Sequence, residues 1–105
     1  MQHFIQADKL SLYLLNINHA KGGSKAKFFL GRGFSPERPD QLAGALLRHP
    51  LQATLTMRSP HQEGHKLVYE CAIAAADGSI PCLRSIWIEA RDGRSCRLVS
   101  AYPFR

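Results

Sequence analysis

Two Asp-Gly dipeptides, Asp77-Gly78 and Asp92-Gly93, divide the second half of this 105-residue chain into strand-like segments. An Asp-Gly pair between alternating apolar and polar residues is a strong hairpin signal, because both central residues of a type I′ turn adopt a positive φ. One more alternating segment lies upstream and is closed by a turn at 59–64. The pattern therefore predicts a four-stranded antiparallel meander. The expected strands are residues 54–57, 65–74, 80–90 and 96–102.

The first half of the chain has helical rather than alternating patterning. Ser24 has the side chain of a helix N-cap, Pro39 suits the first turn of a helix, and Pro50 should end one. The expected helices are residues 9–15, 25–31 and 39–49. We therefore expect an α+β fold in a single domain, 1–105, with two or three N-terminal helices packed on the four-stranded antiparallel meander.

Two-residue turns would also fix the register of the strands. The expected pairs are Cys71 with Arg84, Tyr69 with Ile86, Trp87 with Leu98, Ser85 with Ser100, and Leu83 with Tyr102. One face of the sheet would then be apolar enough to receive the helices, although Arg84 also falls on it. The other face would carry Trp87 and Tyr102 beside hydroxyls and the carboxylate of Glu70, which suits the stacking of single-stranded RNA. The alternative is that both rings are core residues or part of a dimer interface.

The segment 19–34 is strongly basic, with four lysines or arginines, four glycines and no acidic residue. Lys25 and Lys27 open the second expected helix, at the end where the helix dipole is already positive. Each exposed charge there is unfavourable by about 0.3–1 kcal/mol. A bound anion would remove this conflict, because a helix N-terminus preceded by glycines is a natural phosphate site. The alternative is a solvated basic surface turn.

The whole chain is basic as well, with a formal net charge of +6 and a pI near 9.7. Such a charge, clustered in one segment, is typical of a protein that binds nucleic acid or polyphosphate. Basic charge also favours solubility, so the charge alone adds modestly to this interpretation.

Other sequence features disfavour several classes of protein. No stretch approaches the roughly 20 apolar residues of a membrane span, and the first residues lack the basic and apolar regions of a signal peptide. Cys71, Cys82 and Cys96 are an odd number without close spacing, which predicts buried, reduced thiols in a cytosolic protein. A toxin delivered into another cell would look the same. His61 and His65 have no further ligands nearby, so neither a metal nor another cofactor is expected.

Several segments together resemble a small bacterial family of uncharacterised domains. The matching residues are Leu10, 13–15, His19, 22–29, 33–34, 84–88 and 98–103, which include a His-x-x-Gly-Gly-Ser-Lys-Ala motif and a terminal Ser-Ala-Tyr-Pro strand. Ser100 stands where threonine would be expected, and it keeps the hydroxyl. The order of elements also resembles that of the barnase/EndoU/colicin/RelE-like ribonuclease toxins. This second likeness implies a small domain that cleaves RNA.

Metal-independent cleavage of RNA needs a base for the 2′-hydroxyl, an acid for the leaving oxygen, and cations for the charge on phosphorus. His19, in a glycine-bearing loop, could act as base or acid near neutral pH. The candidate catalytic residues are His19, Lys25, Arg84, Ser100 and Tyr102. The candidate nucleic-acid-binding residues are Lys21, Ser24, Lys27, Arg32 and Trp87. Arg84 joins this site only if a bulge shifts its strand or if the cleft opens on the helix side of the sheet.

These observations favour a small basic RNA-binding domain, a metal-independent ribonuclease-like toxin of a toxin–antitoxin or interbacterial system. RNA is the expected substrate, and an acidic antitoxin or immunity protein is the expected protein partner. The competing hypothesis is a non-catalytic binding module, either an antitoxin or immunity partner or an RNA-binding domain. Because toxins tend to be basic and their partners acidic, the net charge favours the toxin. The sequence leaves the oligomeric state open.

Overall fold

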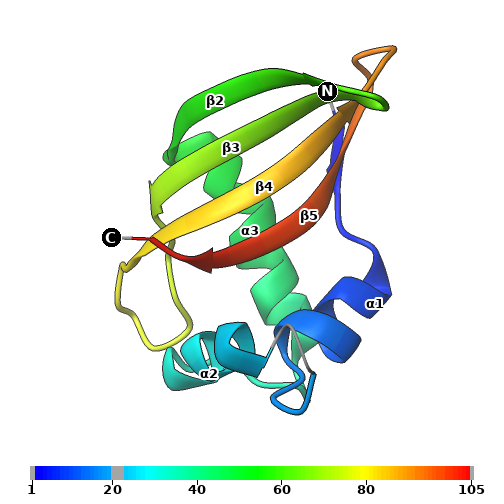
Figure 1. Cartoon of the computed structure of the whole chain (residues 1–105). Coiled ribbons are helices and arrows are strands. Elements are labelled where there is room, and N and C mark those ends of the chain that lie inside the picture. Colours follow the sequence, from blue (N-terminus) through cyan, green and yellow to red (C-terminus); the bar gives the residue numbers. More distant parts are fainter. Residues whose placement is uncertain (1, 20–22, 105) are drawn as a thin grey trace.

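A computed structural model describes residues 2–19 and 23–104 of the chain. It contains a five-stranded sheet in the order β1-β5-β4-β3-β2 together with a few helical segments. Figure 1 shows α3 crossing behind the sheet, with α1 and α2 below it. In chain order the elements are β1 Gln2–Phe4, α1 Ala7–Lys9, η1 Leu10–Leu14, α2 Gly23–Gly31, α3 Pro39–Gln52, β2 Thr54–His61, β3 Gly64–Ala72, β4 Cys82–Ala90 and β5 Ser95–Pro103.

The prediction of a four-stranded antiparallel meander is wrong because β1 adds a fifth strand. β1 lies parallel to β5, with Gln2 opposite Ser95 and Phe4 opposite Arg97, so the sheet is mixed. A three-residue strand is too short to show alternation, and its partner lies at the other end of the sequence. β1 pairs only with residues 95–97, which leaves the rest of β5 as an open edge of the sheet.

The first expected helix, 9–15, is also shorter and less regular than predicted. Instead of a regular helix over 9–15, α1 is a three-residue turn that continues into the wider π-helical turn η1, where the Leu15 N–H bonds to the Leu10 carbonyl at 2.8 Å. Only α3 is long, with 14 residues, and it runs past Pro50 to Gln52. Its buried stripe has the i, i+3, i+4, i+7 spacing of a helix that packs on a sheet. The stripe consists of Leu42, Ala45, Leu46 and His49.

The register differs from the prediction by one residue across the first hairpin. Tyr69 lies opposite Ser85, and Glu70 lies opposite Arg84. The shift arises because Asp77-Gly78 is not a two-residue loop but the tip of a longer connection, 73–81. That connection bends toward the end of α2, where the Asp77 N–H bonds to the Arg32 carbonyl at 3.0 Å.

Gly33 allows this contact between the 73–81 connection and the end of α2. Its φ is +92°, and a Cβ at this position would lie 2.9 Å from the Asp77 nitrogen. A side chain at position 33 would therefore strain the backbone and collide with the connection.

The second hairpin begins in the predicted register, and the expected pair of Trp87 with Leu98 is confirmed. A bulge between Ile86 and Trp87 then shifts the remaining pairs by one. Ser85 lies opposite Ala101 rather than Ser100, and Arg84 lies opposite Tyr102. Because side chains alternate between the two faces of a strand, this shift brings Arg84 to the same face as Tyr102.

The core lies between the sheet and the helices. Trp87 is fully buried there, with Leu14 of η1, Phe29 of α2 and Leu46 of α3 in the same apolar cluster. The expected stacking platform therefore does not include Trp87. The alternative, a core position under the helices, is correct for Trp87 but not for Tyr102, which is only partly buried. Among the helices within residues 2–19 and 23–104, none is long and apolar enough to cross a membrane.

Candidate functional site

Three elements meet at the open edge of β5 around the phenol of Tyr13. The Lys25 ammonium, on α2, donates a hydrogen bond to the Tyr13 hydroxyl, and it lies 4.9 Å from the centre of the ring. On the other side, the same hydroxyl lies 3.4 Å from Ser100 Oγ of β5. Lys9 adds a second cation, 5.2 Å from the Tyr13 ring centre. Tyr13 therefore links η1, α2 and β5.

The environment of Tyr13 makes its hydroxyl more acidic than usual. Partial burial acts to raise the pKa of Tyr13, but its hydrogen bonds with Lys25 and Ser100 and the charges of Lys25 and Lys9 outweigh it. The net effect lowers the pKa below the ordinary value of 10.0. A phenol held this way is a better proton donor than a free tyrosine.

Tyr102 and Arg84 continue the arrangement onto the open face of the sheet. Lys25 Nζ lies 5.6 Å from the centre of the Tyr102 ring, and Arg84 Cζ lies 5.8 Å from the same centre. Arg84 Nη1 is 3.4 Å from the Tyr102 hydroxyl, and its guanidinium stacks 4.2 Å from the centre of Phe104. Tyr102 thus has two cations within 6 Å of its ring centre. We call Tyr13, Lys25, Arg84, Ser100 and Tyr102 the Tyr13–Tyr102 cluster.

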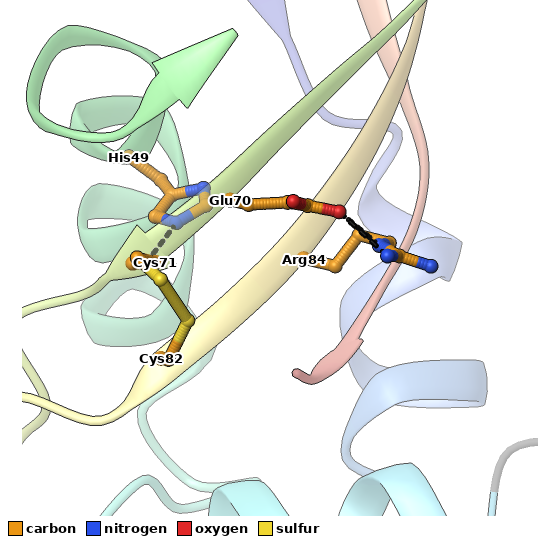
Figure 2. Close-up of a disulfide and its surroundings, with 5 residues drawn as sticks. All are labelled: His49, Glu70, Cys71, Cys82 and Arg84. Carbon is orange, nitrogen blue, oxygen red and sulfur yellow. Dashed lines mark hydrogen bonds and ion pairs between the residues drawn. A yellow bond between two sulfur atoms is a disulfide. The ribbon is translucent and has the colours of Figure 1, made fainter. Parts of the chain in front are cut away.

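Glu70 of β3 orients the arginine of this cluster. Its Oε2 accepts a hydrogen bond from Arg84 Nε at 2.7 Å and forms an ion pair with Nη2 at 2.6 Å, as Figure 2 shows. The hydrogen bond to Tyr102 and the paired carboxylate of Glu70 raise the pKa of Arg84 further above its usual range. Arg84 is therefore a fixed positive charge at the end of the cluster.

His19 lies in the loop before α2, at the border of the cluster. Its ring meets the Tyr13 ring edge-on, with 5.0 Å between the centres. Two backbone hydrogen bonds hold His19 in place. The His19 N–H donates to the Asn16 carbonyl, and the His19 carbonyl accepts from the Gly23 N–H. The imidazole is half-buried, so it stays within reach of solvent.

The structure does not bring the expected nucleic-acid-binding residues together. Lys21 lies outside the described residues. Ser24 is exposed within the first turn of α2, which begins at Gly23, so it is not the N-cap. Lys27 is exposed, and Arg32 turns to the 73–81 connection, where its Nη1 bonds to Ser79 Oγ at 3.2 Å. Trp87 is in the core.

Sequence reasoning missed three residues of the site, Tyr13, Glu70 and Phe104. Tyr13 lies in η1 and is partly buried. A buried tyrosine needs a partner for its hydroxyl, which is the signal that could have drawn attention to it. Glu70 was expected on the face opposite Arg84, and only the shifted register pairs them.

A chain of buried hydrogen bonds lies on the other side of the sheet. Trp87 Nε1 donates to Ser85 Oγ at 2.9 Å, and Ser85 Oγ lies 2.7 Å from His49 Nδ1. His49 Nε2 lies 2.7 Å from the Cys71 carbonyl (Figure 2). A carbonyl can only accept, so Nε2 carries the proton and Nδ1 accepts from Ser85. The chain fixes His49 as a neutral imidazole between α3 and the sheet.

Cys71 and Cys82 form a disulfide at the same end of the sheet, so the prediction of three reduced thiols is wrong for these two. The sequence separation of 11 gives no spacing signal, and the third cysteine makes the count odd. Cys71 has a φ of +91°, uncommon for a residue with a side chain. Only Cys96 is a free thiol in the described part of the chain, and it is buried.

The fold is similar to that of a chain in a contact-dependent growth inhibition toxin–immunity protein complex from Klebsiella pneumoniae 342. The TM-score is 0.71, with 16% sequence identity, over 96% of this chain and 92% of that chain. At this identity the likeness concerns the fold. Among curated proteins, no sequence matches this chain. A family model matches residues 1–105, and the chain therefore belongs to the family described as a domain of unknown function, DUF6883.

Proposed function

We propose that this domain is a metal-independent ribonuclease-like toxin of an interbacterial or toxin–antitoxin system. The observation that carries the proposal is the placement of two cations around one tyrosine. Lys25 Nζ and Arg84 Cζ lie 5.6 Å and 5.8 Å from the centre of the Tyr102 ring, and they come from distant parts of the chain. A phosphate beside this ring would be within reach of both.

The surrounding groups support cleavage at that phosphate. A base removes the proton of the ribose 2′-hydroxyl, the 2′-oxygen attacks phosphorus, and the bond to the 5′-oxygen breaks as an acid protonates it. We assign the base to His19 and the acid to Tyr13, whose lowered pKa suits proton donation. Lys25 and Arg84 stabilise the extra negative charge on the phosphorane. Ser100 orients the Tyr13 hydroxyl.

The similar structure is consistent with either member of a toxin–immunity pair, and the charge supports the toxin rather than its partner. The similar structure is of a toxin–immunity protein complex, and the present chain has a net charge of +6. Toxins that act on RNA and the proteins that inhibit them carry complementary charges. The expected protein partner is therefore an acidic immunity protein or antitoxin.

The direct test is incubation of the purified domain with total RNA, with and without a chelator of divalent metals. We expect cleavage that the chelator does not stop and that falls at least 100-fold in His19→Ala and Lys25→Ala. Arg48→Ala is the control, because it removes one exposed positive charge from α3, remote in sequence from the cluster. RNA that stays intact for hours under both conditions would contradict the proposal. RNA bound without cleavage would favour the non-catalytic binding module.

A further inference from the structure

A hollow lies on the open face of the sheet, directly beside the Tyr13–Tyr102 cluster. Its volume is about 280 Å³, and β2 forms its far side. That is below the roughly 300–1,000 Å³ of drug-sized ligand pockets, so the hollow suits one planar ring system. Its lining includes Lys66, Val68, Glu70, Arg84, Ile86 and Tyr102.

The strand register explains why these side chains meet. Glu70, Arg84 and Tyr102 are direct neighbours across β3, β4 and β5, and they form one polar row. Val68 and Ile86 form the next row and give the hollow an apolar floor. Lys66, two residues before Val68 on β3, closes the row beyond. The hollow therefore has an apolar surface with a carboxylate at one end and an ammonium at the other.

Both polar ends retain hydrogen-bonding capacity. Arg84 contacts Oε2 of Glu70 through Nε and Nη2, and a carboxylate has about four acceptor sites on its two oxygens, so Glu70 can accept further hydrogen bonds. The Lys66 ammonium has no partner among residues 2–19 and 23–104. A ligand that donates to a carboxylate and accepts from an ammonium would satisfy both.

We propose that this hollow is a subsite for a guanine base of the RNA substrate. Guanine presents N–H donors on its Watson–Crick edge, which suit Glu70, and the acceptors O6 and N7, which suit Lys66. Adenine carries a ring acceptor where guanine has the N1–H donor, so it places a lone pair against the carboxylate. Val68 and Ile86 contact the face of the ring. The phosphate attached to the same nucleotide reaches Arg84 and Tyr102.

This inference rests on the proposed function and names its substrate class. The test is binding of 3′-GMP, 3′-AMP, 3′-CMP and 3′-UMP to the purified domain, measured by calorimetry, with inorganic phosphate as the reference. We expect 3′-GMP to bind at least tenfold more tightly than 3′-AMP. Glu70→Gln should remove this preference, and Lys66→Ala should weaken 3′-GMP binding about tenfold. Inorganic phosphate should bind Lys66→Ala as it binds the wild type.

Glu63→Gln is the matched control, because Glu63 also pairs with an arginine, Arg97, but does not line this hollow. It should leave the guanine preference intact. Equal binding of the four nucleotides, or a preference that survives Glu70→Gln and Lys66→Ala, would overturn the subsite. Cleavage of RNA without base preference would overturn the subsite and leave the proposed function standing. Selective binding of 3′-GMP without any RNA cleavage would overturn the proposed function and leave the subsite standing.

Discussion

His49 donates a hydrogen bond from Nε2 to the carbonyl oxygen of Cys71, 2.7 Å away. This contact joins the last full turn of α3 to the end of β3, next to the disulfide. Since Ser85 and Trp87 extend the chain on the other side of the imidazole, one neutral histidine connects a helix, two strands and the only tryptophan of the protein.

The stability of the fold should fall in mild acid. Burial lowers the pKa of His49 below 6.5, only partly offset by the hydrogen bond to Cys71. The unfolded chain therefore takes up the proton first, so the stabilisation is complete above pH 6.5 and is lost as the pH falls toward the folded-state pKa. Urea unfolding at several pH values measures this. The free energy of unfolding should depend less steeply on pH in His49→Gln. An unchanged dependence would show that another group causes the loss of stability in acid.

Removing the disulfide should destabilise the domain by about 3 kcal/mol, because the crosslink closes a loop of about a dozen residues in the unfolded chain. The double variant Cys71→Ser, Cys82→Ser, compared with the wild type in urea, gives this value. Thiol counting provides an independent control. The unreduced, denatured protein should have one free thiol of three, that of Cys96. Three free thiols would contradict the crosslink.

Cys96 itself should resist alkylation in the native state. Burial, with the nearby charge of Glu89, raises the pKa of its thiol to about 11, so almost no thiolate forms at neutral pH. Iodoacetamide should label it only in denaturant. Rapid labelling of the native protein would show that the interior around β5 opens readily.

Tyr13 should ionise at lower pH than Tyr69. Its pKa is lowered from 10.0, whereas burial and nearby negative charge raise that of Tyr69. In a spectrophotometric titration, Tyr13→Phe should therefore remove an early step and Tyr69→Phe a late one. Lys25→Met should move the early step to higher pH, because it removes both a hydrogen bond and a charge. An early step that persists in Tyr13→Phe would contradict the described cluster.

Trp87 should behave as a core residue. Its fluorescence should be shielded from soluble quenchers, and addition of RNA should leave this shielding unchanged. Trp87→Ala should cost about 3–5 kcal/mol of stability, in the range of buried aromatic residues. Trp87→Phe, which keeps most of the apolar volume, is the matched control. Strong quenching in the native protein would place the ring at the surface.

The sequence predicted those features that depend on local patterns. Helical segments before hairpins and the pair of Trp87 with Leu98 follow from spacing and from Asp92-Gly93. The bulge beside Ile86 and the long 73–81 connection left no such pattern, although each moves side chains to the other face. That is why Arg84 was expected with the helices and Trp87 on the open face. Lys25 and Tyr102 were expected in one cleft, and they lie together, but their roles stay a prediction.

The parallel pairing of Gln2–Phe4 with β5 has a consequence for the time course of folding. The hairpins of β2 to β5 can form outward from their turns. β1 can pair with β5 only after a loop of nearly the whole chain closes, and such closure is slow and entropically costly. β1 should therefore dock last and detach first, with rapid hydrogen exchange at its amides. Each detachment of β1 would expose the unpaired backbone of β5 at residues 95–97 next to the edge that is already open. At high protein concentration, copies of the domain would then associate through β5.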